Sequence, residues 1–113
     1  MKQSHVQKLA LALPEATEEP HHHRTSFRVR GKIFATAVPE ENFLNIMVGE
    51  SARDPALDIY SNCVEPLYWG KKVSGIRVNL LKATPEIVAE LLKVAWSEKA
   101  PRALVTKFRG DTK

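Results

Sequence analysis

Cysteine is almost absent from this sequence, in which Cys63 is the one cysteine among 113 residues. A single thiol excludes an intramolecular disulfide and favours a reducing compartment. No secretion signal is visible near the N-terminus, where Ser4, His5 and Gln7 interrupt the apolar segment that such a signal needs. We therefore expect a cytoplasmic protein.

Long apolar runs are missing as well. The longest, such as residues 34–38 and 91–95, fall far short of the ~20 residues that cross a bilayer as a helix. The sequence predicts no membrane association.

Catalytic motifs are also lacking. The chain has no G-x-S-x-G, no Gly-rich phosphate loop, no H-E-x-x-H and no paired-carboxylate motif. Cys63 has Glu65 as its nearest charged neighbour along the chain, and a nearby carboxylate raises a thiol pKa rather than activating the thiol. We expect a non-enzymatic protein with no catalytic residues and no cofactor.

What remains is the composition of one ordinary domain. Hydrophobic residues make up 43% of the chain and charged residues 27%, which is close to the globular average. The length suits a single hydrophobic core, so residues 1–113 are expected to form one domain.

The first half of the chain changes its hydrophobic period. Ser4 and Gln7 have capping-box spacing before an amphipathic helix that Pro14 ends, and residues 15–24 show no period and are expected to be a loop. Residues 25–30 and 33–38 alternate as a hairpin with a basic outer face, and residues 43–48 form a third strand. Strands in direct succession favour an antiparallel meander.

The second half ends in helices. An acidic segment, 50–66, supports a helical turn or two, and residues 76–80 form a fourth strand, with room for a fifth around a hairpin at Lys71 and Lys72. Thr84 and Pro85 begin an amphipathic helix, and Pro101 begins a shorter one. This order predicts an α+β fold in which helices cover one face of an antiparallel sheet. The other face would be solvated and carry Arg28, Arg30 and Arg77.

Positive charge is concentrated in two blocks around an acidic middle. Residues 26–38 carry +3, residues 39–66 carry −5 from six acidic residues and one arginine, and residues 67–82 carry +4. Such a pattern favours an anionic partner over part of the surface, although moderate basicity often serves solubility alone.

Several segments together resemble the MmcQ/YjbR family. They are Leu13-Pro14-Glu15 with Glu18, Ser26-Phe27-Arg28-Val29-Arg30-Gly31-Lys32-Ile33-Phe34-Ala35, Trp69-Gly70-Lys71, Ile76-Arg77-Val78-Asn79-Leu80, and the helix from Thr84-Pro85-Glu86 to Trp96. The resemblance implies a two-layer fold like that of the CyaY (frataxin) proteins and a proposed DNA-binding role through two protruding β wings. It implies no enzymatic reaction. The wings would be the hairpin over residues 28–33 and the segment over residues 69–77, which are the two basic blocks.

The candidate nucleic-acid-binding residues follow from these wings: Arg28, Arg30, Lys32, Tyr68, Trp69, Lys71, Lys72 and Arg77. Alternate residues share a strand face, so the first three cations would line up against phosphates on one side of the hairpin or at its tip. Tyr68 and Trp69 would offer an aromatic platform beside Lys71 and Lys72, as in single-strand binders. An ordinary solvated strand face is the alternative for the cations, and core or edge packing is the commoner role of such a tryptophan.

Two other functions stay open. The aromatic surface around Tyr60, Tyr68 and Trp69 could serve a protein-interaction or small-ligand module. His21, His22 and His23 suggest metal ligation, but consecutive residues of an extended chain do not converge on one ion, so no metal site is predicted. DNA is thus the expected partner, and a monomer the default oligomeric state.

Overall fold

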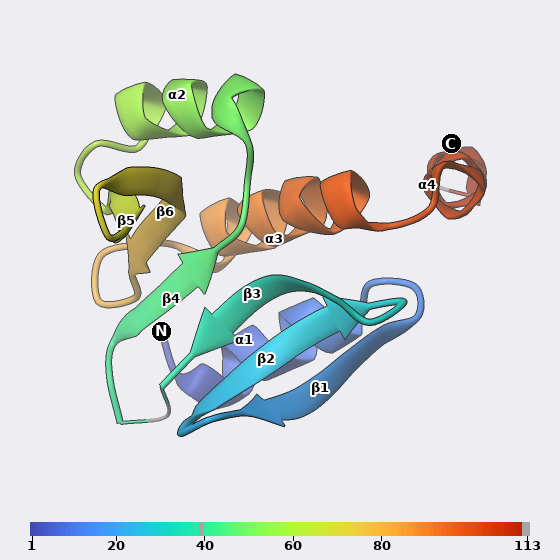
Figure 1. The fold of residues 1–113 in the computed structure, drawn as a ribbon, viewed down its shortest axis with the longest axis horizontal. Helices are drawn as coiled ribbons and strands as arrows, with labels where there is room; N and C mark the ends of the chain where they lie inside the picture. The colour runs from blue at the N-terminus through green and yellow to red at the C-terminus, as the bar shows by residue number, and fades with distance from the viewer. Residues whose placement is uncertain (39, 112–113) are drawn as a thin grey trace.

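Ten elements follow one another in the computed structural model, which describes residues 1–38 and 40–111 (Figure 1). In chain order they are α1 (Gln3–Leu11), β1 (Ala16–His21), β2 (Arg24–Val29), β3 (Lys32–Ala37), β4 (Phe43–Ile46), α2 (Glu50–Ile59), β5 (Val64–Trp69), β6 (Lys72–Asn79), α3 (Pro85–Lys99) and α4 (Arg102–Asp111).

The six strands form one antiparallel sheet in the order β1-β2-β3-β4-β6-β5. The meander of β2, β3 and β4 confirms the pairing expected from the sequence. Helix α2 carries the chain beyond the sheet, so that β5 forms one edge and β6 returns between β5 and β4. The central strand β4 has only four residues and joins two longer hairpins.

One face of the sheet is apolar and lies under the helices. Leu44 and Ile46 of β4 pair with Val78 and Ile76 of β6, and all four side chains are buried. In Figure 1, α1 lies behind β2 and β3, and α3 runs beside β3, on which it packs. Helix α2 packs on β5 and β6. Burying a side chain of this size contributes roughly 1.5–3 kcal/mol, so this layer carries much of the stability.

Trp96 ties three parts of the chain together. Its side chain is fully buried, and its indole Nε1 donates a hydrogen bond to the Pro14 carbonyl at 2.9 Å. Its ring meets that of Phe108 edge to face, with centroids 5.1 Å apart. The amphipathic helix predicted from Thr84 and Pro85 is thereby confirmed, and Phe108 packs the last helix against it.

The N-cap of α3 also matches the sequence prediction. The Thr84 hydroxyl accepts a hydrogen bond from the Ile87 amide at 3.3 Å, and Pro85 occupies the first turn. The predicted capping box of α1 is wrong: Lys2 is the N-cap, and Ser4 lies inside the helix. Gln7 instead donates its side-chain amide to Glu18 on β1, so tertiary contact replaces the local cap.

The expected loop over residues 15–24 is also wrong, because its middle forms the edge strand β1. Its six residues pair in register with β2 from Ala16 opposite Val29 to His21 opposite Arg24. This strand shows no apolar alternation because most of it is exposed, and an edge position tolerates Pro20. Backbone pairing, invisible to hydrophobic periodicity, makes this segment a strand.

Among the described residues, no helix is both long and apolar enough to span a membrane.

Candidate functional site

The helix-free face of the sheet is concave. It forms an open depression of about 1190 Å³, which we call the hollow, lined by Thr36, Val38, Phe43, Asn45, Leu67, Trp69, Arg77 and neighbouring strand and turn residues. Its lining comes from strands and the loops between them, with no contribution from the described helices. The hollow therefore lies between the two hairpins that flank β4.

A row of polar side chains crosses this face at right angles to the strands. The register places Glu19 opposite Ser26, Ser26 opposite Thr36, Thr36 opposite Asn45, Asn45 opposite Arg77, and Arg77 opposite Glu65. We call these six residues the polar row. One comes from each strand, and because directly opposed residues share a face, all six point away from the helices.

Hydrogen bonds fix much of the polar row. Asn45 Nδ2 donates to Thr36 Oγ1 at 3.3 Å, and Ser26 Oγ donates to the Glu19 carbonyl at 2.8 Å. Ser26 and Thr36 are 0% and 3% exposed although no helix covers them. The row is thus a well-packed part of the sheet, and its polar groups are preorganised.

The floor of the hollow is built around Arg77. Its Cζ lies 3.7 Å from the centroid of the Phe43 ring, and its Nη1 lies 3.3 Å from Glu65 Oε1. A cation over an aromatic face contributes about 0.5–1 kcal/mol at partly exposed sites. The guanidinium is therefore held between a ring and a carboxylate.

The cations predicted for the first wing diverge. Arg28 lies on the helix-free face, where its Nε donates to Ser26 Oγ at 3.0 Å and lies 3.9 Å from Glu19 Oε2. Lys32 pairs with Val29, whose side chain is buried, so Lys32 lies on the helix side of the hairpin end. The expected alignment of these side chains on one face is therefore wrong.

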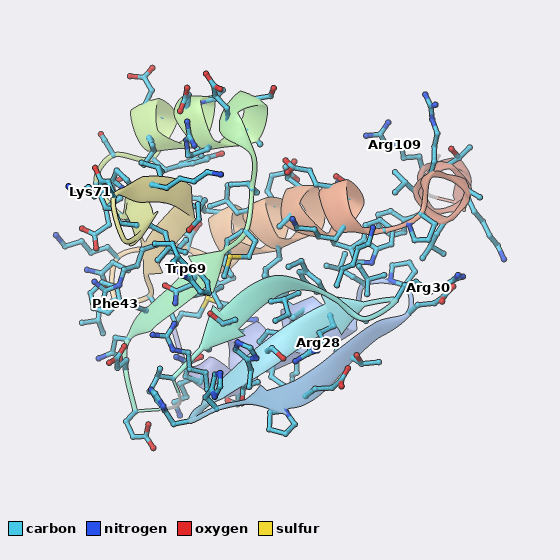
Figure 2. All side chains as sticks on the ribbon, in the orientation of Figure 1. Arg28, Arg30, Phe43, Trp69, Lys71 and Arg109 are labelled. Atoms are coloured by element: carbon cyan, nitrogen blue, oxygen red, sulfur yellow. The ribbon has the colours of Figure 1, made fainter. Side chains whose placement is uncertain are left out.

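Arg30 points elsewhere because of the turn that contains it. Arg30 and Gly31 both have positive φ, of 51° and 80°, as a type I′ hairpin turn requires. The guanidinium forms a bidentate pair with Glu15, from the segment that follows α1. Figure 2 shows Arg30 beside α4, far from Lys71. The prediction that Arg30 lies on the solvated sheet face is wrong.

The Glu15–Arg30 pair has an electrostatic signature. The hydrogen bond from Arg30 lowers the pKa of the Glu15 carboxyl against the opposing effect of desolvation, and the charges of Arg30 and Lys107 add to the lowering. The same hydrogen bond raises the pKa of Arg30. The positive charge of Arg30 is therefore compensated by the Glu15 carboxylate.

The second wing is the β5–β6 hairpin, which turns at Gly70 with a φ of 65°. Trp69 is 72% exposed and Tyr68 61%, so the alternative that Trp69 packs in the core is wrong. Both rings line the hollow, because a register shift between Leu67 and Tyr68 interrupts the regular alternation of strand faces at this point. Both aromatic rings predicted for the platform are therefore exposed beside the hollow.

Lys71 and Lys72 lie at the tip of this hairpin and are exposed. Neither has an ion-pair partner among the residues that the structure describes. Figure 2 shows Lys71 projecting from the tip on the same side of the molecule as Trp69 and Phe43. The structure thus brings Trp69, Lys71, Lys72 and Arg77 to one region, with Arg28 farther along the sheet.

Comparison with known proteins now adds to the geometry. The YjbR family model matches residues 11–98. The chain belongs to the YjbR family. No curated protein matches the chain.

Among solved structures, this YjbR chain is similar to the crystal structure of Deinococcus radiodurans protein DR2400, which carries the DUF419 domain. The TM-score is 0.70 at 17% identity, and the match covers 84% of this chain and 75% of that one. At this identity the likeness concerns the fold. It agrees with the α+β architecture expected from the sequence.

In this YjbR chain, three histidines line the hollow: His21 at the end of β1, and His22 and His23 in the turn to β2. The rings of His21 and His22 are 4.8 Å apart, centroid to centroid. Within residues 1–38 and 40–111, no three histidine, cysteine, aspartate or glutamate side chains gather as metal ligands would. Burial raises the pKa of the Cys63 thiol against a smaller lowering by Lys82, which disfavours the nucleophilic thiolate.

Sequence reasoning missed four residues of the site: Thr36, Phe43, Asn45 and Glu65. A partial signal was present, since Phe43 and Asn45 alternate with the buried Leu44 and Ile46 and must face the other side. Glu65 gave no such signal, because its partnership with Arg77 depends on pairing between strands.

Proposed function

We propose that this YjbR chain is a non-enzymatic DNA-binding protein that takes an unpaired strand at the second wing, with Trp69 stacking on a base and Lys71 and Lys72 contacting phosphates. The exposed ring of Trp69 carries the proposal. Trp69 is 72% exposed. It lies next to the hollow on one side and, on the other, next to two lysines that have no ion-pair partners within the described part of the chain. An exposed aromatic ring beside cations is typical of a single-strand site.

The distribution of charge favours an unpaired strand over a duplex. Duplex binders commonly use 6–10 phosphate contacts, roughly, and gain most of their affinity from them. Here Arg28, Arg30 and Arg77 each have a glutamate within 4.0 Å, and the first wing turns Arg30 away from the second. Of the wing cations, Lys32, Lys71 and Lys72 have no ion-pair partner among the described residues. With so few wing cations for phosphates, stacking has to supply a large share of the binding energy, about 1–3 kcal/mol per base.

Fluorescence anisotropy with labelled DNA tests this proposal. A single strand of about 12 nucleotides lies within the site sizes of single-strand-binding folds. We expect it to bind more tightly than the matching duplex, with a log–log salt slope that falls by roughly 1.4 when Lys71 and Lys72 are both replaced by alanine, at about 0.7 per phosphate contact.

The matched control is Lys93→Ala with Lys99→Ala, on α3, which removes the same charge from the helix-covered side. This control should leave the slope nearly unchanged. Absence of binding to any strand at low salt, or equal effects of the two double variants, rejects the proposal.

A specific observation also supports a second function, that of a small-ligand module. The hollow has room for a small molecule, since its volume exceeds the ~300–1,000 Å³ of typical ligand sites. Arg77 in the hollow is already paired with Glu65, which suits recognition of a neutral molecule. This function would be favoured if a ligand binds in the hollow with an affinity that does not depend on salt, and if the chain does not bind DNA.

A further inference from the structure

Arg77 of the polar row takes no part in the proposed phosphate contacts at the tip of the second wing. Near the β5 end of the row, the Arg77 guanidinium carbon lies 3.7 Å from the centroid of the Phe43 ring, and Nη1 donates a hydrogen bond to Glu65 Oε1. The Arg77 side chain is 38% exposed and lines the hollow. A ligand in the hollow can therefore reach the planar guanidinium, which we call the plate.

The neighbours of this plate are donors and acceptors at strand spacing. Asn45 and Glu65 stand directly opposite Arg77 on the two flanking strands, about 4.8 Å away on either side. Asn45 is oriented by Thr36, and Glu65 bonds Arg77 through Oε1, which leaves Oε2 able to accept from a ligand. A planar ring lying on Arg77 would find a hydrogen-bonding group at each side.

The pair is a poor site for a phosphate. Glu65 neutralises Arg77 and would repel an anion, and the ring of Phe43 already lies against the guanidinium. Guanidinium planes do stack on nucleobases, and amide and carboxylate groups bind base edges. The chemistry therefore suits an uncharged heteroaromatic ring.

We infer that Asn45, Arg77 and Glu65 form a subsite for one unpaired nucleobase, which stacks on the guanidinium and bonds by its edge to the flanking side chains. The inference rests on the proposed function, because the base arrives as part of a strand held by the second wing. Trp69 lies farther along β5 on the same face, so it would hold a different base of that strand.

The test compares two probes of equal length and charge. One is a thymidine strand of about 12 nucleotides, and the other has the same backbone with every base removed. The ratio of their affinities measures base recognition, whereas the salt slope measures phosphate contacts. The variants are Trp69→Ala, which removes only the wing stack, and Glu65→Gln with Arg77→Gln, which leaves the net charge unchanged.

We expect Trp69→Ala to keep a clear preference for the strand with bases. Adding Glu65→Gln and Arg77→Gln should reduce that preference by about fivefold or more, a factor equal to ~1 kcal/mol, while the salt slope stays constant. Phe43→Leu keeps an apolar floor but removes the ring that contacts Arg77, and it should reduce the preference in the same direction. Thermal unfolding of each variant checks the fold.

The outcomes separate the two ideas. An unchanged preference in the Glu65 and Arg77 variant, with binding and its salt slope intact, overturns the base subsite and leaves DNA binding standing. Failure of the parent protein to bind either probe overturns both.

Discussion

The guanidinium carbon of Arg77 lies 3.7 Å from the ring centroid of Phe43, although the two residues are 34 positions apart and on different strands. The contact joins β4 to β6 on the helix-free face, where no apolar layer supports the sheet. We expect a double-mutant cycle with Phe43→Leu and Arg77→Met to give a coupling of about 0.5–1 kcal/mol in urea unfolding. Additive effects would mean that the contact contributes nothing.

Gly75 allows β6 to approach β4. A Cβ added at Gly75 would lie 2.3 Å from the Ile46 carbonyl oxygen, a backbone atom that cannot rotate away. Gly75→Ala should lower the free energy of unfolding by about 1–3 kcal/mol, as overpacking does. Ser74→Ala, at the neighbouring position, is the control and should change stability far less; equal losses in urea titrations would contradict this explanation.

The Glu15–Arg30 pair should be visible in the pH dependence of stability. The folded-state pKa of Glu15 is lowered, so the pair stabilises the fold above the ordinary value near 4.5 and loses that contribution as the pH falls through the lowered pKa. The difference in urea midpoint between the parent and Glu15→Gln should therefore shrink as the pH falls from about 6 to about 3. Arg30→Gln should remove the same difference. A gap that is constant with pH would show that the pair is not coupled to titration.

Arg30 should be dispensable for DNA binding. Its turn has the geometry that Asn-Gly favours, so Arg30→Asn suits the backbone while removing the charge. We expect this variant to keep its affinity for a labelled single strand, in contrast to the Lys71 and Lys72 double variant. A comparable loss of affinity would place the first wing in the interface.

The two tryptophans report on different parts of the molecule. Trp96 is fully buried and Trp69 is 72% exposed. In Trp96→Phe the remaining emission should be red-shifted, accessible to acrylamide and quenched by a DNA strand. In Trp69→Phe it should be blue-shifted and insensitive to DNA. Quenching of Trp96 instead would argue that binding occurs elsewhere or alters the core.

Local chemistry explains what the sequence could predict. Thr84 and Pro85 mark a helix start by their own side chains, and the apolar stripe up to Trp96 follows a helical period. The buried alternation of Leu44, Ile46 and Val48 fixes which side of that segment faces the core. Each of these inferences needs only neighbours within a few residues.

Non-local pairing explains what the sequence could not predict. The polar row depends on the register of five strand pairs, and a shift by one residue in any pair would move part of it to the other face. The direction of Arg30 depends on a positive φ that an arginine rarely adopts. Strand β1 lacks an apolar pattern because it is exposed, so only its pairing with β2 defines it.

The strand order leaves β1 and β5 as the two borders of an open sheet, and each contains a proline, Pro20 in one and Pro66 in the other. Proline has no amide hydrogen to offer an incoming strand, and it is confined to such borders for that reason. Both borders also carry glutamates, which oppose stacking of one molecule on another. These residues thus disfavour pairing between the edge strands of two molecules and the aggregation that would follow, while the concave surface of the sheet stays uncovered.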